Sequence, residues 1–61
     1  MSKVRELRHS RKLTQAQVAL LLGVQPVTVG TWERGEAIPH QRTRRKLARL
    51  LGVTVEELGF S

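Results

Sequence analysis

The sequence contains no cysteine, and its 61 residues include only one tryptophan, one phenylalanine and two histidines. The absence of cysteine excludes disulfide bonds and thiolate metal sites, and it fits a reducing, cytoplasmic environment. His9 and His40 lie far apart with no second histidine at ligand spacing, so we expect no metal site. No apolar run approaches the ~20 residues needed to cross a bilayer, and the N-terminus lacks a signal-peptide core.

The residue patterns of enzymes are also missing. The chain has no nucleophile–base pair, no glycine-rich phosphate loop and too little length for a substrate pocket. Glu56 and Glu57 are adjacent, but at the start of a terminal helical turn they complement the helix dipole. We therefore expect no enzyme activity, no cofactor and no small-molecule ligand.

Acidic residues are few: five Asp and Glu stand against eleven Lys and Arg, which gives a formal net charge of +6. This balance favours a polyanionic partner, with nucleic acid first and an acidic membrane surface second. A membrane-surface helix needs a long apolar face opposite its charges, and no predicted helix is long enough or aromatic enough. Nucleic acid is therefore the expected partner.

A chain of this length holds one core, so we expect a single domain spanning 1–61. Its helix signals are dense. Ser2 is expected to cap a first helix that runs to Arg11. The segment Thr-Gln-Ala-Gln at 14–17 matches the S/T-x-x-E/Q capping box and begins a second helix. This helix is expected to end at Gly23, because glycine readily adopts the left-handed conformation that closes a helix.

Three more helices are expected further along the chain. One covers 26–34, because it starts with a proline, which suits the first helical position, and Gly35 follows its end. Another covers 41–51 and is followed by Gly52. A second capping box at 54–57 predicts a fifth helix. No strand pattern is present, so the predicted fold class is all-α, with five short helices.

The segment 14–35 has the order helix, glycine-containing turn, helix that is typical of a helix-turn-helix. It carries no charge before Glu33 and lies between two basic segments, 3–12 and 34–49. Such an arrangement suits DNA, because phosphates attract the cations while neutral polar side chains contact base edges.

The chain resembles the phage-repressor, Cro-like (XRE-type) helix-turn-helix family, from about Val4 to Leu58. The resemblance rests on Leu13-Thr14-Gln15, Ala19, Leu22-Gly23-Val24, Val29, Trp32, Glu33-x-Gly35, Pro39, Leu47-Ala48, Leu51-Gly52-Val53 and Glu57-Leu58.

This resemblance implies a compact, five-helix, lambda-repressor-like domain whose helix 26–34 enters the major groove of double-stranded DNA. The positions that it implies for contact with base edges are Gln25, Pro26, Val27, Gly30 and Thr31. Those that it implies for contact with phosphates are Gln15, Thr28 and Arg34, and Gln15 is also the position that braces the recognition helix. Arg8 and Glu33 match an ion pair that ties the first helix to the end of the third.

Two of the base-contacting positions, Pro26 and Gly30, offer no side-chain donor or acceptor to a base. The remaining side chains at this face are Gln25, Val27, Thr28 and Thr31. Glutamine can pair with adenine, and valine or threonine methyl groups can pack on the methyl group of thymine. The sequence therefore predicts a preference for A·T base pairs.

Cations crowd the helix expected at 41–51: Arg42, Arg44, Arg45, Lys46 and Arg49. In the family that the chain resembles, the preceding connection lies along the DNA backbone. We therefore expect Arg42 and Arg45 to contact phosphates, although a merely solvated basic face is the alternative.

The resemblance implies a transcriptional regulator, with repression as the favoured mode. Cro-like domains tend to form homodimers through their C-terminal end, here Val53, Val55, Leu58 and Phe60. The alternative is that these residues close a small core, and this is the favoured interpretation for Val53 and Leu58. Leu20 and Leu21 are unusual, because the family generally has polar residues there. If both are exposed, they mark contact with a partner or a second copy. The alternative function is a protein-interaction module, such as an antitoxin or adaptor.

Overall fold

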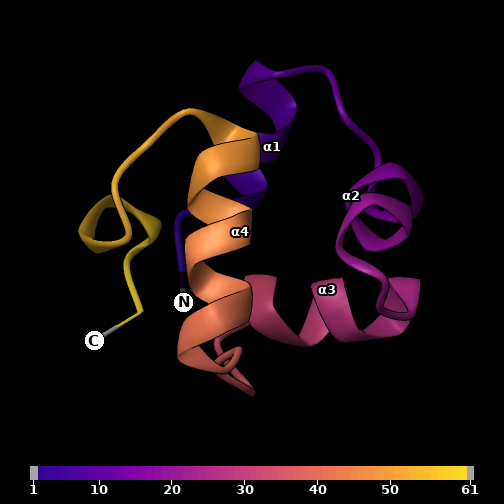
Figure 1. Cartoon of the computed structure of the whole chain (residues 1–61). Helices are drawn as coiled ribbons and strands as arrows, with labels where there is room; N and C mark the ends of the chain where they lie inside the picture. The colour runs from indigo at the N-terminus through magenta and orange to yellow at the C-terminus, as the bar shows by residue number, and fades with distance from the viewer. Residues whose placement is uncertain (1, 61) are drawn as a thin grey trace.

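The computed structural model describes residues 2–60 and is all-α within that range. Its elements are α1 (Val4–Ser10), α2 (Gln15–Leu22), α3 (Pro26–Glu33), α4 (Gln41–Leu51) and the 3-10 turn η1 (Glu56–Leu58). In Figure 1, α3 runs along the lower edge, with α2 above one of its ends and α4 upright in front of α1. Residues 1 and 61 of the predicted domain lie outside the described residues. None of the described helices has the length and apolar character needed to cross a bilayer.

The prediction of a fifth helix is wrong, because the C-terminal segment forms only the single turn η1. The predicted capping box does form, because the Thr54 amide donates to Glu57 Oε1 at 2.9 Å and the Glu57 amide donates to Thr54 Oγ1 at 3.2 Å. Gly59 then adopts a left-handed conformation, with φ of 80°, directly after the turn. A capping box thus identifies where a helical turn begins, while the glycine decides how short it is.

The start of α1 also differs from the prediction. Lys3, and not Ser2, occupies the cap position, and it makes no side-chain capping bond. The Ser2 hydroxyl accepts from the Val4 amide at 3.3 Å and donates to the Trp32 carbonyl at 2.9 Å. The Lys3 amide donates to the Leu58 carbonyl at 2.9 Å. The first described residues therefore join both α3 and the C-terminal turn.

The starts of α2 and α3 agree with the sequence signals. Thr14 caps α2 in a complete capping box with Gln17, and Gly23 closes the helix at φ of 72°. Pro26 is the first residue of α3. Helices α1 and α3 end at Ser10 and Glu33, one residue earlier than expected, a difference within the usual fraying of helix ends.

One apolar core is shared by all four helices and the C-terminal turn. Its buried members are Val4, Val18, Ala19, Val29, Trp32, Leu47, Ala48, Leu51 and Leu58. Val29 and Trp32 are spaced by three and both point inward from α3, as helical periodicity predicts. Their burial fixes which face of α3 remains exposed.

Gly23 and Gly52 close α2 and α4 with the same φ of 72°. A methyl group at Gly23 would have no heavy atom within 4 Å, whereas one at Gly52 would collide with the Arg11 guanidinium. That guanidinium donates to the Leu51 carbonyl at 3.2 Å.

We expect Gly23→Ala to lower the free energy of unfolding by about 1 kcal/mol, which is the strain of a left-handed alanine. Gly52→Ala should cost more, because it also displaces Arg11. Urea denaturation of the two variants measures the difference, and equal losses would show that the Arg11 contact contributes nothing.

Candidate nucleic-acid interface

A buried ion pair joins α1 to the C-terminal end of α3. Arg8 Nε lies 2.6 Å from Glu33 Oε2, and Arg8 Nη2 donates to Glu33 Oε1 at 3.2 Å. Arg8 Nη1 also donates to the Leu13 carbonyl at 2.9 Å. Only 7% of Arg8 and 6% of Glu33 is exposed, so the pair is shielded from water. A bidentate pair of this kind fixes geometry, because the planar guanidinium fork matches the carboxylate.

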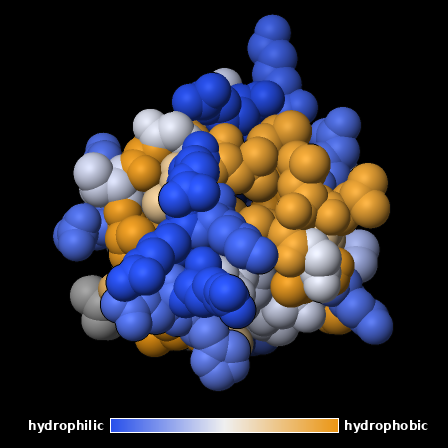
Figure 2. All heavy atoms as spheres, in the orientation of Figure 1, coloured by the Kyte–Doolittle hydropathy of each residue, from blue (hydrophilic) through white to orange (hydrophobic). Residues whose placement is uncertain are grey.

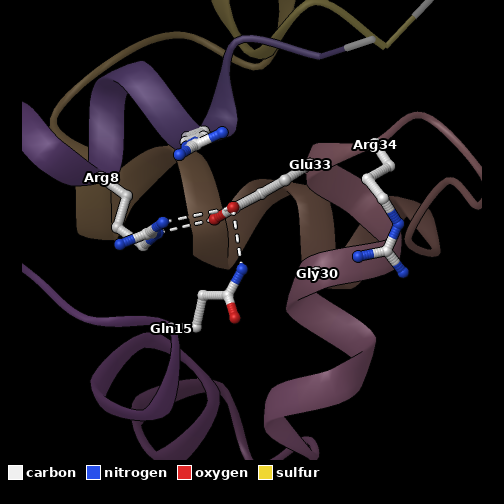
Figure 3. Close-up of a pocket in the computed structure, with 6 residues that line it drawn as sticks. Arg8, Gln15, Gly30, Glu33 and Arg34 are labelled. Carbon is white, nitrogen blue, oxygen red and sulfur yellow. Dashed lines mark hydrogen bonds and ion pairs between the residues drawn. The ribbon is translucent and has the colours of Figure 1, made fainter.

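Gln15, the first residue of α2, completes this cluster. Its Nε2 donates to Glu33 Oε1 at 3.0 Å, so side chains from α1, α2 and α3 meet at one carboxylate (Figure 3). Burial alone would raise the pKa of Glu33, but the hydrogen bonds from Arg8 and Gln15 and the charge of Arg8 outweigh it and lower the pKa. Glu33 is therefore ionised at neutral pH and holds the helix-turn-helix against α1.

A hollow of about 320 Å³ opens beside this cluster, lined by Arg5, Arg8, Gln15, Gly30, Glu33 and Arg34. Arg8 and Glu33 neutralise each other at its base. Arg5 and Arg34, both exposed, then leave the hollow positively charged. The arrangement suits an anion that is held by arginine and amide hydrogens.

The outer face of α3 begins with three exposed residues, Gln25, Pro26 and Val27. Thr28 and Thr31 are half-buried, and the Thr31 hydroxyl donates to the Thr28 carbonyl at 2.6 Å. The hydroxyl proton of Thr31 is thereby engaged, while its oxygen can still accept a hydrogen bond. The N-terminal half of α3 is thus the part most open to a partner.

Gly30 is placed differently from the other base-contacting candidates, because it is buried. A methyl group there would lie 3.2 Å from Arg34 Nη1 and 3.6 Å from Gln15 Nε2. Figure 3 shows the Arg34 side chain beside this point of α3. A base could approach Gly30 only after the Arg34 guanidinium had moved. The sequence does not indicate that Arg34 covers Gly30, because this contact depends on how the long Arg34 side chain folds back.

Residues 4–58 match the family described as Helix-turn-helix. The chain belongs to the Cro/C1-type (XRE) helix-turn-helix family. This is a family of DNA-binding domains and not of enzymes, and its match covers all four helices and the C-terminal turn.

Several curated relatives are similar over most of this chain. The cryptic phage CTXphi transcriptional repressor RstR of Vibrio cholerae is 42% identical over 57 residues, which is 93% of this chain and 51% of RstR. Multiprotein-bridging factor 1b of Arabidopsis thaliana is 41% identical over 49 residues, 80% of this chain and 34% of that protein. The HTH-type transcriptional activator BcrR of Enterococcus faecalis is 32% identical over 56 residues, 92% of this chain and 28% of BcrR.

The chain spans between about a quarter and half of the length of these relatives. No solved structure matches it significantly. The relatives share the helix-turn-helix domain while their names describe a repressor, an activator and a bridging factor.

In this helix-turn-helix domain, Arg34 follows α3 and pairs with Glu36, with Arg34 Nε 2.9 Å from Glu36 Oε2. More than half of each side chain is exposed, 57% and 58%, so water screens the pair. The hydrogen bond from Arg34 lowers the pKa of Glu36. Sequence reasoning missed Glu36, although an acid two residues after an expected phosphate contact was a visible signal. A phosphate at Arg34 must compete with this carboxylate.

The helix-turn-helix domain carries its densest charge on α4, which has five cations and no acid. Arg42 and Arg45 are exposed, as phosphate contacts require. Arg44 is half-buried, and its Nε is buried without a hydrogen-bond partner among the described residues. The N-terminal end of α4 lies near α3 at the lower edge of the molecule (Figure 1), and Arg42 is the second residue of α4.

Proposed function

We propose that this domain binds double-stranded DNA in a sequence-specific manner, with α3 in the major groove, as part of a transcriptional regulator. The observation that carries the proposal is the Glu33 cluster, which locks α3 to α1 and α2 and leaves the N-terminal half of α3 exposed. A rigidly held helix with a neutral outer face is what direct contact with base edges needs.

Gln25, Val27, Thr28 and Thr31 are the side chains proposed to face the bases. Gln25 can bond both N6 and N7 of adenine, and the exposed methyl groups of Val27 can pack on thymine. Pro26 and Gly30 would let the backbone of α3 come close to the DNA, but they offer no side-chain hydrogen bond to a base. The proposed preference is therefore for A·T pairs.

Phosphates are proposed to bind on both sides of α3. On one side, Gln15 uses one amide hydrogen on Glu33 and retains the other for a phosphate oxygen, and Arg34 lines the same hollow. On the other side, Arg42 and Arg45 supply charge from α4. Thr28, half-buried on α3, is the remaining proposed backbone contact.

Repression is the mode of regulation that we propose, because the named repressor RstR is 42% identical to this chain and the named activator BcrR is 32% identical, over similar shares of the chain. We also propose a homodimer as the active form, since one recognition helix offers few base contacts and paired domains read two half-sites about one helical turn apart. The proposed location of such a regulator is the cytoplasm.

Selection of binding sites from random DNA tests this proposal. Thr31→Ala and Val27→Ala should change the selected sequence, whereas Arg34→Ala should weaken binding to all sequences alike. The length of the selected site distinguishes one copy from two. Selection of no consensus by the wild-type protein would contradict sequence-specific binding, and identical behaviour of Thr31→Ala and Arg34→Ala would contradict the placing of the base contacts.

A second candidate function is a protein-interaction module of the same fold. It is favoured by one observation: Leu20 and Leu21 are both exposed, at 82% and 60%. Normal protein binding by a Leu20→Glu plus Leu21→Glu variant would contradict this alternative, while loss of protein binding with unchanged DNA affinity would support it.

A further inference from the structure

A groove between α2 and α4 is lined by Leu21, Leu22, Lys46, Arg49 and Leu50 and has a volume of about 320 Å³. Figure 2 shows hydrophobic side chains gathered over α2, directly beside the hydrophilic side chains of α4. The groove combines an apolar floor with two cations on one wall. None of the residues proposed to contact DNA lines the groove, although Lys46 and Arg49 lie one helical turn beyond Arg42 and Arg45 on α4.

From this combination we infer that the groove binds an acidic amphipathic helix of another protein. Leucine-like side chains of the partner would enter between Leu21 and Leu50, and its carboxylates would pair with Lys46 and Arg49. Neither cation has a salt-bridge partner among residues 2–60. The inference goes beyond DNA binding and does not depend on it.

A helix suits the groove better than an extended peptide. The groove lies between two helices, a shape that receives the apolar stripe of a third helix with anchors spaced by three or four residues. A strand-like peptide would need the free edge of a sheet, and the described residues contain no strand. A polyproline segment would need an aromatic-lined groove, and no aromatic residue lines this one.

The partner's charge follows from what surrounds the groove. Helix α2 carries no charged residue, and α4 carries five cations and no acid. A second copy of this chain docked face to face would place Lys46 and Arg49 against the same cations, an arrangement that costs energy. A partner rich in glutamate or aspartate replaces this repulsion with attraction and increases the rate of association.

The probe for the test is a fluorescein-labelled synthetic peptide of about 16 residues, long enough to form a helix on its own. It carries leucines along one face and glutamates on the other. A second peptide has lysine in place of every glutamate. Fluorescence anisotropy with the full chain should show binding of the acidic peptide and at least tenfold weaker binding of the basic one.

Matched variants locate the site. Leu21→Glu and the pair Lys46→Glu plus Arg49→Glu should each weaken binding of the acidic peptide at least tenfold. Ala16→Glu is the control, because Ala16 is exposed on the same helix but does not line the groove. Circular dichroism checks that every variant keeps its helices. Equal effects of Leu21→Glu and Ala16→Glu would overturn the inference.

Two further experiments test whether the peptide binds at the DNA surface or whether the groove binds a membrane. Addition of an A·T-rich duplex should leave the acidic peptide bound, because no residue proposed to contact DNA lines the groove. Displacement of the peptide by DNA would show that the peptide only occupied the DNA surface and would overturn the inference. Phosphatidylserine vesicles should not displace the acidic peptide from the groove. Binding of the vesicles but not of the acidic peptide at millimolar concentration would assign the groove to a membrane and overturn it as well.

Discussion

Replacement of Glu33 by glutamine is expected to destabilise the domain by about 3 kcal/mol or more, because it leaves the Arg8 guanidinium buried without a counter-charge. Domains of this size have a total free energy of unfolding of roughly 3 to 9 kcal/mol. The Glu33→Gln variant should therefore be close to unfolding at 25 °C. Thermal and urea denaturation followed by circular dichroism measure the loss.

Two controls accompany this prediction. Glu36→Gln removes an exposed carboxylate from an ion pair of similar length and should leave stability nearly unchanged. The double variant Arg8→Met plus Glu33→Leu replaces both charges with apolar groups and should recover most of the stability lost in Glu33→Gln. If the double variant is as unstable as the single one, an unpaired buried charge is not the cause.

The same pair should make the wild-type protein sensitive to acid. The pKa of Glu33 in the folded state lies below its ordinary value of 4.5. Its contribution to stability is therefore complete above the unfolded-state pKa and is lost as the pH falls through the folded-state pKa. Denaturation of the wild-type protein should show this loss below about pH 5, and the Glu33→Gln profile should be flatter over the same range.

The affinity for DNA is expected to fall about 500-fold when monovalent salt rises from 50 to 200 mM. With about five phosphate contacts, the logarithm of the binding constant should fall with the logarithm of salt concentration with a slope of roughly −4 to −5, because bound counterions are released from the DNA. Fluorescence anisotropy of a labelled duplex, titrated at several salt concentrations, gives the slope.

Variants of α4 sharpen this measurement. Arg42→Ala and Arg45→Ala should each reduce the steepness of the slope by about 1, whereas Thr31→Ala should leave it unchanged, since Thr31 carries no charge. An association with DNA that does not depend on salt would contradict the proposed interface. Unchanged slopes in both arginine variants would show that α4 is a solvated basic face.

The parts of the fold that could be predicted are those decided by neighbouring residues. The capping box at Thr14, the proline that begins α3 and the glycines that close α2 and α4 each act within a single turn. The length of the C-terminal turn could not be predicted in the same way. It depends on Gly59 and on Leu58, which is buried in a core built by residues far away in sequence.

The candidate site also has parts that could be predicted and parts that could not. Arg8 and Glu33 could be matched through the family resemblance, and the structure places them in contact. The resemblance implied that Gln15 braces the recognition helix but did not name Glu33 as its partner. The cover of Arg34 over Gly30 could not be predicted, because it depends on how one long side chain folds back along its own helix. The exposure of both Leu20 and Leu21 was left open by the sequence for a related reason: a uniformly apolar helix does not reveal which side is outward.

The hydrogen bond from the Lys3 amide to the Leu58 carbonyl connects residues separated by nearly the whole length of the chain. The Ser2 hydroxyl binds the end of α3 at the same place. Opening of α1 therefore breaks the contacts of the C-terminal turn, and opening of that turn breaks the contacts of α1. Within residues 2–60 we therefore expect the amide protons of α1 and of the C-terminal turn to exchange together, as one cooperative unit of unfolding.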